Sequence, residues 1–170
     1  MLKSPFTLAL EAPHQAHAVE ALNHQAFGPG RFAKTAHRLR EFRAMIAELA
    51  FVAMDGSFLA GSVRYWPIAI GEAPALLLGP LAVEPSRRSQ GIGESLMTRS
   101  LARAAELGHE LVILVGDLPY YARAGFAVAP AGQIQLPGPV DPARLLCREL
   151  VSGAIVRAHG MTRGTGERAS

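Results

Sequence analysis

The sequence predicts a single α/β domain in which helices flank a central mixed β-sheet. Residues 75–83 are an apolar run, a basic loop leads from it into a helical pattern at 91–107, and a second apolar run follows at 111–115. A segment that is apolar at every position, as 111–115 is, is typical of a strand buried on both faces in a parallel sheet. An Asp-Gly-Ser turn at 55–57 lies between two further apolar runs and predicts an antiparallel hairpin. A mixed sheet accommodates both kinds of strand pair.

The first part of the chain is expected to supply a strand, two helices and the hairpin. A strand is predicted at 6–11 and a helix at 13–26, ending before a Gly-Pro-Gly break. A second helix is expected from 31 to about 49. Its apolar residues recur at three- and four-residue spacing: Leu39, Phe42, Ile46 and Leu49. The hairpin strands are then 51–54 and 58–70.

The central strand at 75–83 contains a proline where a β-ladder needs an N–H donor. Pro80 cannot donate, so a bulge or a splay is predicted at Gly79 and Pro80. The helix at 91–107 is amphipathic, and Gly108 follows it as a cap. Its predicted buried face consists of Met97, Leu101, Ala104 and Ala105.

The C-terminal part of the chain has a weaker pattern. Strands are predicted at 126–128 and 145–151, separated by a connector rich in proline and glycine at 130–142. Because the pattern fades after residue 152, the domain is expected to span 1–152. Residues 153–170 are expected to be a flexible, solvated tail.

Composition and charge exclude several classes of protein. No apolar run approaches the ~20 residues of a membrane span, and 17 Lys plus Arg against 14 Asp plus Glu give a net charge of +3, too small to indicate a nucleic-acid-binding surface. The N-terminus lacks a secretory signal, and the lone Cys147 cannot form an internal disulfide. We therefore expect a cytoplasmic protein. The six histidines show no metal-ligand spacing, so no metal is expected.

The loop between the central strand and the next helix has the properties of an anion site. Backbone N–H groups at a helix start lack intrahelical partners and carry the positive end of the helix dipole. The loop reads Arg88-x-x-Gly91-x-Gly93. It is neither a dinucleotide fingerprint, since Leu96 stands where a third glycine is needed, nor a P-loop, since Gly-Lys-Ser/Thr is absent. The predicted diphosphate ligands are backbone N–H groups of Ser89, Gln90, Gly91, Ile92 and Gly93, with the charge of Arg88.

These residues resemble the acetyl-coenzyme A signature of the Gcn5-related N-acetyltransferase (GNAT) superfamily, Gln/Arg-x-x-Gly-x-Gly/Ala. The superfamily also carries Tyr-x-x-x-Gly-Phe after the next strand, and Tyr121, Gly125 and Phe126 match it. The sequence around both motifs further resembles that of a bacterial branch of predicted acetyltransferases, the YhbS-like group. The resemblance is strongest over residues 50–128.

The resemblance implies a single GNAT-like domain whose two parallel strands splay apart, with acetyl-coenzyme A as co-substrate. The backbone of Leu81, Ala82 and Val83 would then bond the pantetheine arm, and a main-chain N–H at Leu81 or Ala82 would polarise the acetyl carbonyl. Tyr121 occupies the position where the superfamily usually keeps the acid that protonates the leaving thiolate. The expected reaction is direct acetyl transfer to an amine in a ternary complex.

Several assignments stay open at this stage. Asp117, Glu72 and His37 are alternative general bases, and Tyr65 and Trp66 are candidates for the lining of an acceptor pocket. The acceptor is a small-molecule or peptide amine of unspecified kind, and a homodimer is an open alternative to a monomer. The alternative functions are a non-catalytic module that binds or senses coenzyme A, and a doubly wound nucleotide-binding domain.

Overall fold

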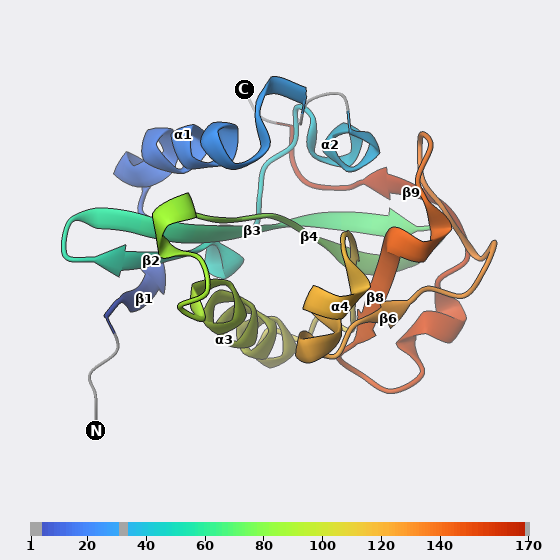
Figure 1. Cartoon of the computed structure of the whole chain (residues 1–170). Helices are drawn as coiled ribbons and strands as arrows, with labels where there is room; N and C mark the ends of the chain where they lie inside the picture. The colour runs from blue at the N-terminus through green and yellow to red at the C-terminus, as the bar shows by residue number, and fades with distance from the viewer. Residues whose placement is uncertain (1–4, 31–33, 169–170) are drawn as a thin grey trace.

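One mixed sheet runs through the computed structural model, which describes residues 5–30 and 34–168 (Figure 1). The strands are β1 Thr7–Leu10, β2 Phe51–Asp55, β3 Phe58–Ile70, β4 Ala73–Val83, β5 Leu111–Val115, β6 Ala127–Val128, β7 Ile134–Gln135, β8 Leu145–Glu149 and β9 Gly160–Gly164. Their order across the sheet is β1-β2-β3-β4-β5-β8-β6, and β9 pairs with both β3 and β7. The predicted mixed α/β architecture is confirmed.

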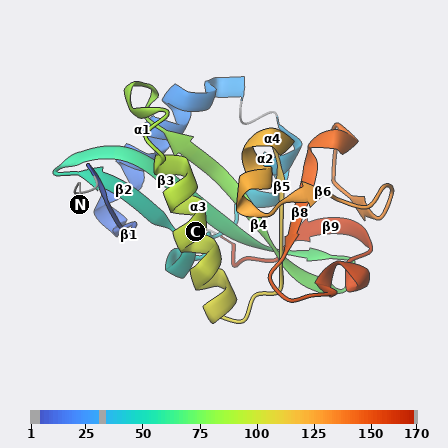
Figure 2. The same cartoon turned by 60° about the horizontal axis from the view of Figure 1, so that its bottom comes forward.

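Helices cover both faces of the sheet (Figures 1 and 2). They are α1 Ala16–Phe27, α2 Thr35–Arg40, α3 Ile92–Glu106 and α4 Leu118–Tyr121. α1 and α2 lie on one face, and α3 and α4 lie on the other. Across residues 5–30 and 34–168, no helix has both the length and the apolar character that a membrane crossing requires.

The hairpin and the strand–helix–strand unit lie where the sequence predicts them. β2 and β3 pair antiparallel across the Asp55-Gly56 turn, and β5 pairs parallel with β4. α3 connects these parallel strands and packs on β2, β3 and β4. Its buried side includes Leu96, Met97 and Leu101, each at most 2% exposed, and burying one such side chain contributes about 1.5–3 kcal/mol. Ala105 is exposed, so the predicted buried face is wrong at that residue.

β4 and β5 separate after a short stretch of pairing. Only Leu76 and Leu77 of β4 pair with β5. The register between β3 and β4 shifts where β4 contains Gly79 and Pro80, and the indole Nε1 of Trp66 donates to the Gly79 carbonyl at 2.5 Å. The predicted bulge and splay are therefore confirmed. They leave one edge of β4 without a strand partner over its last residues.

The second predicted helix is wrong in its length. α2 ends at Arg40 instead of continuing to residue 49, while residues 31–33, where the helix was expected to begin, lie outside the described residues. Phe42 has a φ of 59° and is 76% exposed, so it is not part of a buried helical face. The N–H of Ile46 donates to the Tyr65 carbonyl in β3 at 2.9 Å. A hydrogen bond to β3 thus takes the place of the bonds that would continue the helix.

The C-terminal segment belongs to the sheet, which differs from the tail expected at 153–170. β9 pairs antiparallel with β3 from Ile68 to Ile70 and parallel with β7, and Thr162 in β9 is 2% exposed. β2 pairs with β3 only as far as Val63. The far end of β3 would otherwise be an unpaired edge, and β9 supplies its missing partner. Sheet pairing therefore extends past the domain boundary predicted at residue 152.

A buried hydroxyl pair connects α3 to β3 and makes a testable contribution to stability. Tyr65 Oη lies 2.7 Å from Ser100 Oγ, and both residues are fully buried. We expect Ser100→Ala to lower the free energy of unfolding by about 1–3 kcal/mol, because the Tyr65 hydroxyl loses its partner inside the core. Urea unfolding measures this loss. The double variant Tyr65→Phe/Ser100→Ala should recover part of it, and equal losses in the single and double variants would contradict the account.

Candidate active site

The free edge of β4 exposes backbone hydrogen-bonding groups of Leu81 and Val83. The N–H of Glu84, just beyond β4, donates to the Ala60 carbonyl in β3 at 2.8 Å. Because backbone groups alternate in direction along an antiparallel strand, Ala82 also faces β3, and it pairs there with Ser62. Leu81 and Val83 therefore present their N–H and C=O groups to the side where β5 has separated.

The loop after β4 presents backbone donors at the start of α3. Ser89 and Gly91 both have left-handed backbones, with φ of 68° and 80°, and Gly91 caps the helix. Glycine adopts this conformation without strain. The N–H groups of the first helical turn, including Ile92 and Gly93, have no intrahelical acceptor and sit at the positive end of the helix dipole. This is a site that favours an anion.

The two neighbouring arginines of the loop have different roles. Arg87 forms an ion pair with Asp55 at 2.7 Å and lies over the Phe58 ring at 5.0 Å, so it holds the loop against the β2–β3 hairpin. Both arginines line the pocket described next, but Arg87 is held by its ion pair, whereas Arg88 is exposed. Arg88 is therefore the arginine of the pair that is placed to meet an anion.

A pocket of about 630 Å³, here called the loop pocket, joins the end of β4 to this loop. Most of the predicted cofactor residues line it: Leu81, Ala82, Val83, Arg88, Ser89, Gly91, Ile92 and Gly93. Gln90 is exposed and is not among the lining residues. Arg123 also lines the pocket, and sequence reasoning missed it. The sequence signal that could have identified Arg123 is its basic charge inside the Tyr-x-x-x-Gly-Phe segment.

Two adjacent tyrosines close the loop pocket on the α4 side. The Tyr120 hydroxyl lies against Gly93, and a side-chain Cβ at residue 93 would come within 2.0 Å of it. The Tyr121 ring packs edge-on against Tyr120 and Phe126, with centroid distances of 5.0 and 6.0 Å. Tyr121 also lines a second pocket, whereas Tyr120 does not. Tyr121 is thus the phenol in the wall that the two pockets share.

Burial keeps the Tyr121 phenol protonated. Loss of solvent around the ring raises the pKa of Tyr121 to about 12, and the nearby Tyr120 and Asp117 add to the increase. The ordinary pKa of tyrosine is about 10. Tyr121 is therefore a neutral donor throughout the neutral and mildly alkaline range.

This pKa predicts a late phenolate signal in an alkaline titration. The folded pKa of Tyr121, about 12, exceeds the unfolded value, so burial of the neutral phenol stabilises the fold below pH about 10, and that stabilisation is lost as the pH rises toward 12. We expect the difference in phenolate absorbance between wild type and Tyr121→Phe to appear only well above pH 10, with circular dichroism reporting the folded state. A Tyr121 signal at the ordinary tyrosine pKa in folded protein would contradict the burial account.

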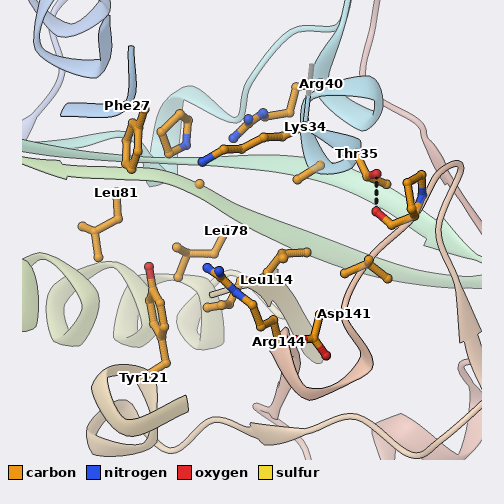
Figure 3. Close-up of a pocket in the computed structure, with 16 residues that line it drawn as sticks. Phe27, Lys34, Thr35, Arg40, Leu78, Leu81, Leu114, Tyr121, Asp141 and Arg144 are labelled. Atoms are coloured by element: carbon orange, nitrogen blue, oxygen red, sulfur yellow. Dashed lines mark hydrogen bonds between the residues drawn. The ribbon is translucent and has the colours of Figure 1, made fainter. Parts of the chain in front are cut away.

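The second pocket, here called the side pocket, has a volume of about 490 Å³ (Figure 3). It lies between the bulge of β4, α2 and the segment 137–144, which overlaps the end of the predicted connector and is called the connector from here on. Two hydrogen bonds tie the connector to α2: Thr35 Oγ1 donates to the Pro139 carbonyl at 2.6 Å, and Arg38 donates to the Pro137 carbonyl at 2.7 Å. These contacts hold the outer wall of the side pocket in place.

The three alternative bases do not line the side pocket. Asp117 is exposed and lies 3.6 Å from Arg144, Glu72 lines a separate pocket at the β3–β4 turn, and His37 lines a neighbouring pocket. The carboxylate that does line the side pocket is Asp141, which sequence reasoning missed. It lies in the Pro/Gly-rich connector, where no local pattern singles it out.

The two aromatic candidates for the lining of an acceptor pocket, Tyr65 and Trp66, instead stabilise the fold. Tyr65 is buried against α3, and Trp66 bonds the bulge at Gly79. Among the residues that the structure describes, no group of three or more His, Cys, Asp or Glu side chains is gathered as a metal site requires.

Comparisons with known proteins indicate the family of the chain. Residues 47–128 match the family model of the acetyltransferase (GNAT) domain. The Escherichia coli K12 protein described as "Uncharacterized N-acetyltransferase YhbS" is 30% identical over 124 residues, which are 72% of this chain and 74% of that protein.

Solved structures of two bacterial proteins share the fold. The crystal structure of the GNAT family N-acetyltransferase YhbS from Escherichia coli in complex with CoA has a TM-score of 0.80 and 25% identity, covering 97% of this chain and 92% of that one. A GNAT family acetyltransferase from Brucella melitensis in complex with acetyl-CoA has a TM-score of 0.61 and 25% identity, covering 89% and 99%. The chain therefore belongs to the GNAT acetyltransferase family.

Proposed function

We propose that the protein transfers the acetyl group of acetyl-coenzyme A to the nitrogen of an amine, with both substrates bound at once. One observation carries this proposal: Tyr121 lies in the wall shared by the loop pocket and the side pocket. A donor in that position serves a reaction whose two substrates enter from different pockets. Complexes of the two bacterial relatives with CoA and acetyl-CoA support the choice of co-substrate.

The loop pocket fits a diphosphate followed by a pantetheine arm. Backbone donors at the start of α3 face an anion there, and Arg88 and Arg123 add positive charge. The free N–H and C=O groups of Leu81 and Val83 match the amides of pantetheine, in the way that an added strand pairs with a sheet edge. Coenzyme A bound in this way supplies the acetyl group as a thioester.

Polarisation of the acetyl carbonyl is assigned to the N–H of Leu81. Between the two candidates, Leu81 and Ala82, the alternation of the strand directs the Leu81 N–H away from β3 and leaves that of Ala82 bonded within the sheet. A fixed backbone donor of this kind stabilises the negative charge that develops on the carbonyl oxygen.

Tyr121 is the proposed source of the proton for the leaving sulfur. Amide formation takes a proton from the amine, and release of the thiol adds one to sulfur, so the reaction needs a group that moves a proton between them. The phenol of Tyr121 is neutral because its pKa is raised to about 12. It donates to the departing sulfur and regains a proton that the amine gives up.

Direct transfer is proposed because the cysteine of this chain is not at either pocket. Cys147 lies in β8 opposite Ile113 of β5 and lines neither the loop pocket nor the side pocket. Burial also raises the pKa of its thiol, which disfavours the nucleophilic thiolate. The acetyl group therefore passes directly to the amine, without a covalent intermediate on Cys147.

Release of free thiol from acetyl-coenzyme A, measured over a panel of amines, tests the proposed function. We expect acetyl-coenzyme A to raise the melting temperature and some amines to accelerate thiol release. If acetyl-coenzyme A stabilises the protein and no amine accelerates release, a non-catalytic coenzyme A-binding module becomes the better account. If acetyl-coenzyme A does not bind, the assignment of the loop pocket is wrong.

A further inference from the structure

The side pocket is lined by an excess of positive charge. Among the described residues that line it, Lys34, Arg40 and Arg144 have cationic side chains, and Asp141 has the one carboxylate. Figure 3 shows Lys34 and Arg144 extending toward the middle of the pocket from opposite sides, with Tyr121 beside Arg144. Lys34 directly precedes α2, Arg40 ends α2, and Arg144 ends the connector. The cations therefore come from the two walls that the hydrogen bond from Thr35 to Pro139 joins.

The contacts of Lys34 and Arg144 leave the positive charge of these two side chains only partly compensated. Asp141 accepts the N–H of Ala143 at 3.0 Å and so caps the turn that carries Arg144. Arg144 and Asp117 are 3.6 Å apart, and both side chains are more than half exposed, so their attraction is weak. The Lys34 ammonium lies 5.4 Å from the centroid of the Phe27 ring, an interaction that leaves its charge in place.

We propose that the acceptor is an amine that also carries an acidic group, a carboxylate or a phosphate, which Lys34 and Arg144 bind in the side pocket. This inference rests on the proposed function, because it takes the side pocket as the place of the acceptor. An acidic group gains charge-assisted hydrogen bonds from an ammonium and a guanidinium. A polyamine or an aminoglycoside would instead bring several positive charges close to those of Lys34 and Arg144.

The acidic group also fixes the position of the reacting amine. When it is bound to Lys34 and Arg144, the amine of the acceptor is held near Tyr121, the residue in the wall that the side pocket shares with the loop pocket. The acceptor is thus positioned without the three predicted bases, none of which lines the side pocket.

Matched pairs of acceptors test the inference. The first arm compares α-amino acids with their carboxamides, and the second compares phosphoethanolamine with ethanolamine, so that the two arms separate carboxylate from phosphate. We expect the acidic member of at least one arm to have a kcat/KM larger by about tenfold to hundredfold, the effect of losing a hydrogen bond to a charged group. Thiol release from acetyl-coenzyme A is the readout.

Charge variants at the wall provide the second measurement. We expect Lys34→Gln and Arg144→Gln to raise KM for the acidic acceptor more than they lower kcat, and Lys34→Glu to shift preference toward the uncharged partner of the pair. Arg40 is left unchanged, because it also lines the neighbouring pocket that contains Glu20 and Glu41. The matched control is Arg103→Gln, which removes a positive charge from α3, where Arg103 pairs with Glu106, outside both pockets.

The outcomes separate this inference from the proposed function. Acid preference that weakens in the Lys34 and Arg144 variants, and not in Arg103→Gln, supports the inference. Equal turnover of the paired acceptors, faster turnover of carboxamides or polyamines, or turnover of other amines while no acidic amine reacts overturns it. No turnover with any amine, or failure of acetyl-coenzyme A to bind, overturns the proposed function instead.

Discussion

Replacing Tyr121 with phenylalanine should lower kcat for acetyl transfer by about 10²–10⁴-fold, the usual contribution of a positioned acid. The substitution removes only the hydroxyl. The ring keeps its edge-on packing against Tyr120 and Phe126, so the fold and the shape of both pockets should be preserved. Affinity for acetyl-coenzyme A should change little, because the donors proposed for the diphosphate are in the loop and at the start of α3.

Single-turnover thiol release, together with acetyl-coenzyme A titration, measures the two quantities separately. Tyr120→Phe is the comparison variant, because Tyr120 lines the loop pocket but not the side pocket. We expect this variant to retain most of the wild-type kcat. A Tyr121→Phe protein with wild-type kcat would remove Tyr121 from the mechanism. A large loss in Tyr120→Phe, with little in Tyr121→Phe, would move the role to its neighbour.

Gly91→Asp should weaken acetyl-coenzyme A binding by about a hundredfold or more, because a carboxylate beside a diphosphate costs several kcal/mol. Gly91 has a φ of 80°, and a Cβ built on it meets nothing within 4 Å. The new side chain therefore has room, and the expected loss comes from charge and blocked approach.

Gly91→Asn is the matched control, because asparagine has nearly the same shape, tolerates the left-handed conformation comparably and carries no charge. We expect its Kd for acetyl-coenzyme A, measured by calorimetry, to lie much closer to wild type. Equal losses in the two variants would show that space or backbone strain, and not charge, limits binding. Unchanged binding in Gly91→Asp would place the diphosphate elsewhere.

The sequence by itself determined the parts of the molecule whose signals are local. A few neighbouring residues are enough to determine three of these parts: the Asp55-Gly56 turn, the apolar strand at 111–115 and the loop from Arg88 to Gly93. Pro80 likewise predicts the bulge, because it lacks an N–H wherever it stands. The predicted cofactor residues follow these elements, and the structure gathers all but Gln90 around the loop pocket.

Tertiary structure alone decided where α2 ends, what completes β3 and what lines the side pocket. Ile46 gives its N–H to β3, and β9 pairs with the part of β3 that β2 leaves uncovered. Lys34 and Arg144 are brought to one pocket by hydrogen bonds between α2 and the connector. The contacts of β9 with β3 and of the connector with α2 join segments about a hundred residues apart. The free energy of these contacts depends on packing that no local periodicity records.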